Sequence, residues 1–229
     1  MKKLFLATLL VTMCACAMSA PTLYGPNGIV TYPTASSGDS LVCVTPYVMT
    51  YGGDDWTASL VANVDLGVVE AYGSISVYDG EDFSFDELSS YGAKVKIKTN
   101  EDSRVAVGAT MFADDRVDIY GAISNEIFDL SLIDLNVTCG VNYQTTKNDY
   151  NKGDTRVFAG ATTKLTDIIK VGAEASLPLN GPSGTIYSLG ASVDLFLLKV
   201  NAGMTNNKNG YKSDDMGYFV NMGYTFSLL

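Results

Sequence analysis

Eleven charged residues fall on the polar side of short segments in which apolar and polar residues alternate. If such segments are β-strands, alternate side chains point to opposite sides, and these charges share one surface. On an enclosed surface they could line an aqueous path and bias which ions pass. They could equally pair with one another and fill the interior. This charged inner set comprises Glu70, Lys94, Lys96, Arg104, Asp118, Asp134, Arg156, Lys170, Glu174, Asp194 and Lys199.

Enzymatic chemistry has little support in the residue types. The chain contains no histidine, which excludes Ser-His and Cys-His catalysis and histidine-based metal sites. Carboxylate pairs can hydrolyse glycosides, but Asp54–Asp55, Asp114–Asp115 and Asp214–Asp215 lie in polar stretches typical of solvated loops. The acidic stretch 79–87 could gather Ca²⁺, although it lacks the EF-hand spacing. We therefore expect no catalytic residue, no cofactor and no metal.

The elements that position the charges show a period of two. In 91–98, 133–143 and 169–177, apolar residues on odd positions alternate with polar or charged residues on even positions. No stretch after the leader approaches the roughly 18 apolar residues of a membrane-spanning helix. A weak two-residue alternation, repeated many times in segments of about ten residues, is typical of outer-membrane β-barrels.

The same pattern along the chain predicts about twelve strands, with a range of ten to fourteen. The fold class is therefore all-β: a transmembrane antiparallel up-and-down β-barrel. A secreted β-sandwich is the soluble alternative, but its strands are usually about 5–6 residues long. The strands are predicted near 40–51, 56–65, 68–78, 89–98, 104–112, 116–123, 132–143, 155–164, 168–177, 185–195, 198–205 and 217–228.

The predicted connections alternate in length. Long polar links at 79–88, 144–154, 178–184 and 206–216 follow odd-numbered strands, and most tight turns follow even-numbered ones. Short periplasmic turns and longer outer loops are the usual arrangement of outer-membrane barrels. An even strand count then leaves both termini on the periplasmic side.

The N-terminus reads as a secretory signal peptide. Lys2 and Lys3 precede an apolar run over 4–13 and small residues at the expected cleavage site before Ala20. A lipoprotein signal ending at Cys16 is the alternative. We expect a signal peptide over 1–19, an irregular periplasmic or lumen-tucked segment over 20–38, and the barrel over 39–229.

Removing this leader leaves an acidic chain. The full chain has 15 basic and 25 acidic residues; without Lys2 and Lys3 the balance is 13 against 25, a net charge of −12. Nucleic acid is not an expected partner, because it is bound by a basic face. Of the cysteines, Cys43 and Cys139 remain, on predicted strands one and seven, and we expect no disulfide because opposite barrel walls exceed bridging distance.

The C-terminal residues carry a resemblance. Asn221-x-Gly223-x-x-Phe226-x-Leu228 resembles the signal by which bacterial outer-membrane β-barrels are recognised for assembly. The resemblance implies outer-membrane lipid and the barrel-assembly machinery as partners, and it implies a location in the outer membrane of a Gram-negative envelope.

A second resemblance lies in the segment before the barrel. Gly28-Ile29-Val30-x-x-Pro33-Thr34-Ala35 resembles the N-terminal segment of an outer-membrane β-barrel family linked to exopolysaccharide production. Tucking this segment into the periplasmic mouth would bury its apolar side chains; a disordered leader to the first strand is the alternative.

Two functions therefore remain open for a barrel that is monomeric by default. One is a porin-like small pore for ions or small solutes. The other is a structural or envelope-interaction barrel linked to surface polysaccharide, without transport. A secreted soluble β-protein is the third and least supported hypothesis.

Overall fold

The computed structural model describes residues 33–35, 42–50, 56–79, 89–100, 102–130, 133–146, 149–180, 184–195, 198–208 and 211–226. These ranges hold twelve β-strands. They are β1 (Val42–Thr50), β2 (Trp56–Asp65), β3 (Val69–Asp79), β4 (Ser90–Lys98), β5 (Ser103–Phe112), β6 (Val117–Leu130), β7 (Ile133–Thr146), β8 (Asp149–Lys164), β9 (Ile169–Pro178), β10 (Ile186–Leu195), β11 (Leu198–Lys208) and β12 (Tyr211–Phe226).

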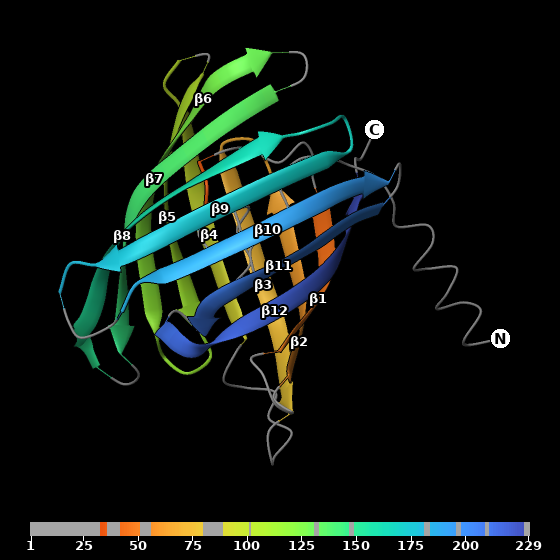
Figure 1. Ribbon diagram of the computed structural model, residues 1–229. Helices are drawn as coiled ribbons and strands as arrows, with labels where there is room; N and C mark the ends of the chain where they lie inside the picture. Colours follow the sequence, from red (N-terminus) through yellow and green to blue (C-terminus); the bar gives the residue numbers. More distant parts are fainter. Residues whose placement is uncertain are drawn as a thin grey trace.

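The strands form one closed antiparallel barrel (Figure 1). Each strand pairs with its neighbours in the sequence, and β12 returns to pair with β1 from Val42↔Phe226 to Thr50↔Tyr218. Closure removes the open sheet edge that would otherwise invite aggregation. The predicted twelve-stranded β-barrel is confirmed. In the part of the chain described here, no helix is long and apolar enough to cross a membrane.

The two faces of the wall differ sharply in chemistry. On β1, Cys43, Thr45, Tyr47 and Met49 are buried, whereas Val48 between them is 55% exposed. Large apolar side chains are exposed on the outward positions of every strand. No Asp, Glu, Lys or Arg occupies the outward positions of β2, β4, β9 or β10. An exposed apolar belt of this extent marks a surface that is covered by lipid or by a partner.

The barrel has two rims. The rim at which β1 begins and β12 ends, here called the terminal rim, also carries the turns that follow even-numbered strands. In the tight β2–β3 turn, Gly67 takes the positive φ of 82° that favours glycine, and its N–H donates to Asp65 Oδ1 at 2.8 Å. The rim at the far ends of the strands is called the opposite rim.

Two of the predicted long loops are wrong, because the structure places strands there. The expected links at 144–154 and 206–216 are largely taken up by the paired ends of β7–β8 and β11–β12. Backbone hydrogen bonds continue there although the residues are polar on both faces, so alternation gives no signal. Likewise β6 runs to Leu130, beyond its predicted end near 123, because a bulge between Glu126 and Phe128 breaks the two-residue period. Figure 1 shows the resulting β6–β7 hairpin extending past its neighbours.

Glycines on the inner face make room for aromatic rings on the next strand. Tyr120 lies opposite Gly108, and Phe158 lies opposite Gly140. A Cβ built on Gly140 would lie 2.3 Å from both Phe158 Cζ and the Gly121 carbonyl oxygen. The same pairing joins Tyr72 to Gly92 and Phe219 to Gly203. Aromatic side chains folded over cross-strand glycines stabilise the register of the sheet.

The two cysteines lie far apart, as the strand order requires. Cys43 is on β1 and Cys139 on β7, six strands away around a ring of twelve. Cys43 is buried on the inner face, Cys139 is exposed on the outer face, and both are free thiols.

Candidate functional site

The charged inner set lies on the inward positions of its strands. Six of its residues are buried at 9% exposure or less: Glu70, Lys94, Lys96, Arg156, Glu174 and Lys199. The other five are half-buried: Arg104, Asp118, Asp134, Lys170 and Asp194. Closure of the barrel is what brings these residues, drawn from nine strands, to one enclosed surface.

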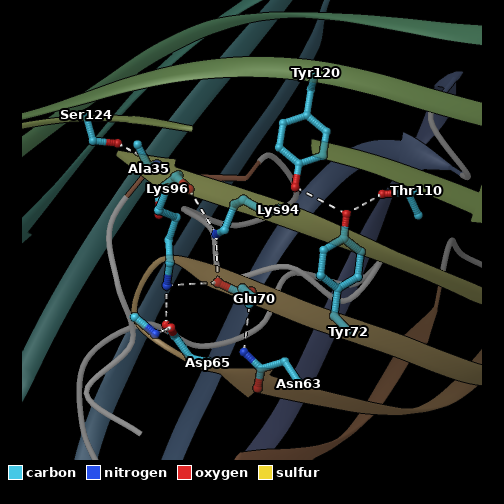
Figure 2. Close-up of polar contacts among 12 residues, drawn as sticks. Ala35, Asn63, Asp65, Glu70, Tyr72, Lys94, Lys96, Thr110, Tyr120 and Ser124 are labelled. Atoms are coloured by element: carbon cyan, nitrogen blue, oxygen red, sulfur yellow. Dashed lines mark hydrogen bonds and ion pairs between the residues drawn. The ribbon is translucent and has the colours of Figure 1, made fainter. Parts of the chain in front are cut away.

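Four of the charged residues near the terminal rim form one ion-pair network (Figure 2). Lys94 Nζ lies 2.9 Å from Glu70 Oε2, and Lys96 Nζ lies 3.8 Å from the same oxygen and pairs with Asp65. Asp65 faces Glu70 across β2–β3, and Glu70 faces Lys94 across β3–β4. All four are almost completely buried. Buried charges persist only when they are paired in this way.

Asp65 was not included in the charged inner set, although its position on the strand indicates that it points inward. It shares the inward parity of Ser59, Val61 and Asn63 on β2, but it also adjoins a turn, where an aspartate suggests only turn formation. In the structure Asp65 serves both roles, because one oxygen accepts from Gly67 N and the other pairs with Lys96.

This network also contacts the segment that precedes the barrel. Lys94 Nζ donates to the Thr34 carbonyl oxygen at 3.0 Å, and the Ala35 N–H donates to Ser124 Oγ at 2.9 Å. Figure 2 shows Ala35 beside Ser124. Thr34 is 7% exposed and Ala35 is fully buried. Of the expected segment 20–38, only residues 33–35 belong to the part that the structure describes.

A second group of charges lies on the far wall near the same rim. Lys199 Nζ is 3.8 Å from Asp194 Oδ1 across β10–β11. Lys164 is the direct cross-strand neighbour of both Asp134 and Lys170. The neighbouring Lys164 and Lys170 are thus flanked by Asp134, and Lys199 lies beside Asp194, so each wall holds charges of both signs.

Arginines near the opposite rim tie the wall to its connections. Arg156 donates to Asp154 at 2.8 Å, to Ser176 Oγ at 2.8 Å and to the Gly184 carbonyl oxygen at 2.7 Å. Arg116, which the sequence did not single out, pairs with Asp114 at 2.7 Å. Asp114 lies in a turn as predicted, but it is the partner of a largely buried ion pair and not a solvated charge.

Hydroxyl and amide side chains line the wall between the charged groups. Ser59–Ser76, Ser74–Ser90 and Ser124–Thr138 are joined at 2.7 Å, and Ser188–Thr205 at 2.8 Å. Asn201 bonds Asn221 across β11–β12. Tyr72 bonds Thr110 at 2.9 Å and Tyr120 at 3.2 Å. A search of the sequence for charged residues cannot find these uncharged residues. Only their place on the alternate strand positions that point into the barrel identifies them.

The remaining members of the charged inner set have simpler surroundings. Asp118 accepts from Asn142 Nδ2 at 3.1 Å. Arg104 is half-buried and lies opposite Ser124 on β6. Glu174 is buried on β9, opposite Gly160 and Ser188.

The residues of the assembly signal lie on the strand that closes the barrel. Asn221 and Gly223 point inward and are buried. Phe226 is the last residue of β12 and pairs with Val42 of β1. Leu228 lies outside the described residues.

The other acidic candidates provide no site in the described chain. Asp214 and Asp215 are exposed on β12. Asp54, Asp55 and most of the acidic stretch 79–87 lie outside the ranges given above. Within those ranges, no group of three or more His, Cys, Asp or Glu side chains could hold a metal ion.

Comparison with known proteins adds evidence on the fold. No protein-family model and no curated protein matches the chain. Among solved structures, the chain is similar to the KdgM porin, with a TM-score of 0.59 and 12% identity over 80% of this chain and 99% of that one. It is also similar to the NanC porin, with a TM-score of 0.55 and 9% identity over 82% and 100% of the two chains. A bacterial polysaccharide outer membrane secretin gives a TM-score of 0.51 and 10% identity over 82% and 99%.

These identities are too low to transfer an activity, and the likeness is one of fold. The chain is a porin-like barrel of the type found in the outer membrane, and it spans nearly the whole length of each of these three structures.

Proposed function

We propose that this protein is a non-enzymatic outer-membrane pore for ions and small polar solutes, with both termini on the periplasmic side. The observation that carries the proposal is the closed twelve-stranded wall, apolar on its outer face and polar on its inner face. Only a closed barrel lets β-strands cross a bilayer, because every backbone group then finds a partner within the wall.

The outer face supports a lipid environment. Side chains such as Leu60, Val107 and Leu189 are about half exposed on outward positions. In water this belt would promote aggregation, whereas lipid tails solvate it. Acyl chains of the outer membrane are therefore the partner that we assign to it.

The inner face supports passage with little charge preference. The charged inner set contains six cations and five anions, and its ion pairs place opposite signs side by side. One solved KdgM structure, with a TM-score of 0.54, is described as a complex with oligogalacturonate, which is a polyanion. Carboxylates lie beside the lysines of the described inner wall, as Glu70 does beside Lys94 and Asp194 beside Lys199, so we do not extend an acidic saccharide to it.

Planar-bilayer recording of protein extracted from outer membranes tests the pore. We expect discrete conductance steps and, in a salt gradient, a reversal potential close to zero because the wall charges balance. The contradicting outcome is a current that stays at the lipid baseline for the wild-type protein and for every inner-wall variant described below.

A structural or envelope-interaction role linked to surface polysaccharide is the second candidate. The near-complete burial of Glu70, Lys94 and Arg156 favours it, because small barrels whose interiors are filled by side chains serve without a channel. Under this alternative, an envelope partner co-purifies with the protein and is lost when residues 21–38 are deleted, while conductance is absent throughout.

A further inference from the structure

We propose that the inner wall formed by β4, β5 and β6 is a binding site for the chain's own residues 33–35, and that this bound segment holds the path through the barrel closed. The binding part of the proposal stands on the geometry of the site. The closing part rests on the proposed pore function.

The site recognises the main chain of the segment. One backbone acceptor, the Thr34 carbonyl oxygen, and one backbone donor, the Ala35 N–H, are each bonded by a side chain of the wall. We call these two hydrogen bonds the tether. Lys94 and Ala35 are fully buried, so both bonds form away from bulk water. A main chain outside regular structure needs such partners before it can remain buried.

The two side chains that bind the segment, Lys94 and Ser124, are called the anchors, and other residues of the wall hold both of them in place. Lys94 Nζ is held by Glu70 Oε2 at 2.9 Å. Its ammonium group has three N–H donors, so it can donate to the Thr34 carbonyl oxygen at the same time. The Ser124 hydroxyl is held by Thr138 Oγ1 at 2.7 Å and accepts from Ala35 N. A receptor whose groups are already in place binds with little reorganisation, which favours a specific interaction.

The wall between the anchors is built from small residues. Lys94 is on β4 and Ser124 on β6, so the segment crosses the inner face of β5. On β5, Gly108 lies opposite Lys94 and Arg104 lies opposite Ser124, with Ala106 between them. Ala106 and its neighbour on β6, Ala122, are both almost completely buried. Alanine at these two positions leaves space that the longer polar side chains elsewhere on the wall would fill.

The tether can be released without breaking the barrel. The two hydrogen bonds of the tether come from side chains of the wall, whereas the strand pairs that carry these side chains are joined along their backbones. Each hydrogen bond contributes modestly to stability. The segment can therefore exchange between a bound state, which occupies the interior, and a released state, which leaves the path open.

Thiol accessibility tests the binding site independently of conduction. Ala35→Cys is introduced into a chain that also carries Cys43→Ser and Cys139→Ser, and a small water-soluble maleimide is reacted with the protein in outer membranes. The parent should react slowly. We expect at least a tenfold faster reaction when Ser124→Ala or the paired change Glu70→Gln with Lys94→Met removes one bond of the tether. The paired change avoids leaving the Glu70 carboxylate without its partner.

Ser103→Ala is the matched control for Ser124→Ala. Ser103 also bonds an adjacent strand, through Asn125 at 2.6 Å, but it is on the outer side of the β5–β6 pair at the terminal rim. Its removal should leave the labelling rate unchanged. A fast reaction in the parent, or equal rates in all variants, would overturn the binding site.

Bilayer recording without the added cysteine then tests closure. Ser124→Ala and the paired change should raise the fraction of time spent conducting at least threefold above the wild type, whereas Ser103→Ala should match it. If the wild type and all variants conduct alike, the proposal that the tether blocks the path is wrong, whereas the proposed pore function is supported. If the labelling rate rises but neither the wild type nor any variant conducts, both the blocking of the path and the proposed pore function are wrong.

Discussion

At the scale of single residues, buried charge on the inner wall is organised in pairs. Glu70 has Lys94 at 2.9 Å and Lys96 at 3.8 Å, so neutralising one partner changes the environment of the others. The cost of taking a charge out of water is recovered only while its counter-charge is present. A variant that loses one charge but keeps its partner is therefore expected to be less stable than one that loses both.

Lys94→Met alone should destabilise the protein by about 3–5 kcal/mol, because it strands a buried carboxylate. The paired change Glu70→Gln with Lys94→Met removes both charges and should cost distinctly less. Urea unfolding of the wild type, both single variants and the pair closes a double-mutant cycle. A pair that is no more stable than Lys94→Met would contradict the coupling.

At the scale of elements, the register places glycine opposite aromatic rings, and the available space can be tested with one methyl group. A Cβ on Gly140 would meet the Gly121 carbonyl oxygen at 2.3 Å, and backbone cannot easily move away. We expect Gly140→Ala to cost about 1–3 kcal/mol, the usual range for overpacking.

Gly121→Ala is its control on the adjacent strand, because the nearest atom to its Cβ is the Ala106 carbonyl oxygen at 4.0 Å. It should change stability by less than about 0.5 kcal/mol, as surface changes usually do. Urea unfolding measures both variants. Equal effects would show that the aromatic–glycine pairing does not constrain the wall.

The outward face of β10 offers a second test at this scale. Leu189 is in mid-strand, whereas Leu195 ends the strand at the terminal rim; both are about half exposed. In a bilayer, Leu189→Arg should cost about 2–4 kcal/mol and Leu195→Arg about 1 kcal/mol or less, because the penalty depends on depth. Unfolding from lipid vesicles measures both. Equal costs would argue that this face does not meet lipid.

At the scale of the whole molecule, closure by β1 and β12 is the feature on which location and function both depend. Val48 and Val220 are direct partners across this pair, and both point outward. Cα atoms of antiparallel partners lie about 4.5–5.5 Å apart, within reach of a disulfide.

Val48→Cys with Val220→Cys, in a chain whose Cys43 and Cys139 are replaced by serine, should therefore form a disulfide that joins the two ends of the barrel. Mass measurement with and without reductant detects the loss of two hydrogens. Val48→Cys with Val141→Cys, which places the second thiol on β7 across the ring, should remain reduced. Two free thiols in the first variant would contradict closure.

The sequence alone determined the fold class and predicted about twelve strands, within a range of ten to fourteen. Alternation in segments such as 91–98 and 169–177 reflects a wall with two different environments, and that requirement acts on each residue locally. Parity alone also placed Glu70, Lys94 and Arg156 on one face. It failed where both faces of a strand are polar, as at the paired ends of β7 and β8, and where the β6 bulge shifts the period.

Only the tertiary structure decided which of these residues meet. Glu70 contacts Lys94 because β3 and β4 pair in one register, and a shift by one residue would turn one of the two outward. The contacts of Thr34 with Lys94 and of Ala35 with Ser124 span 60 and 89 residues of sequence. Such contacts depend on how the barrel closes around its own interior, and no local pattern of residues records that geometry.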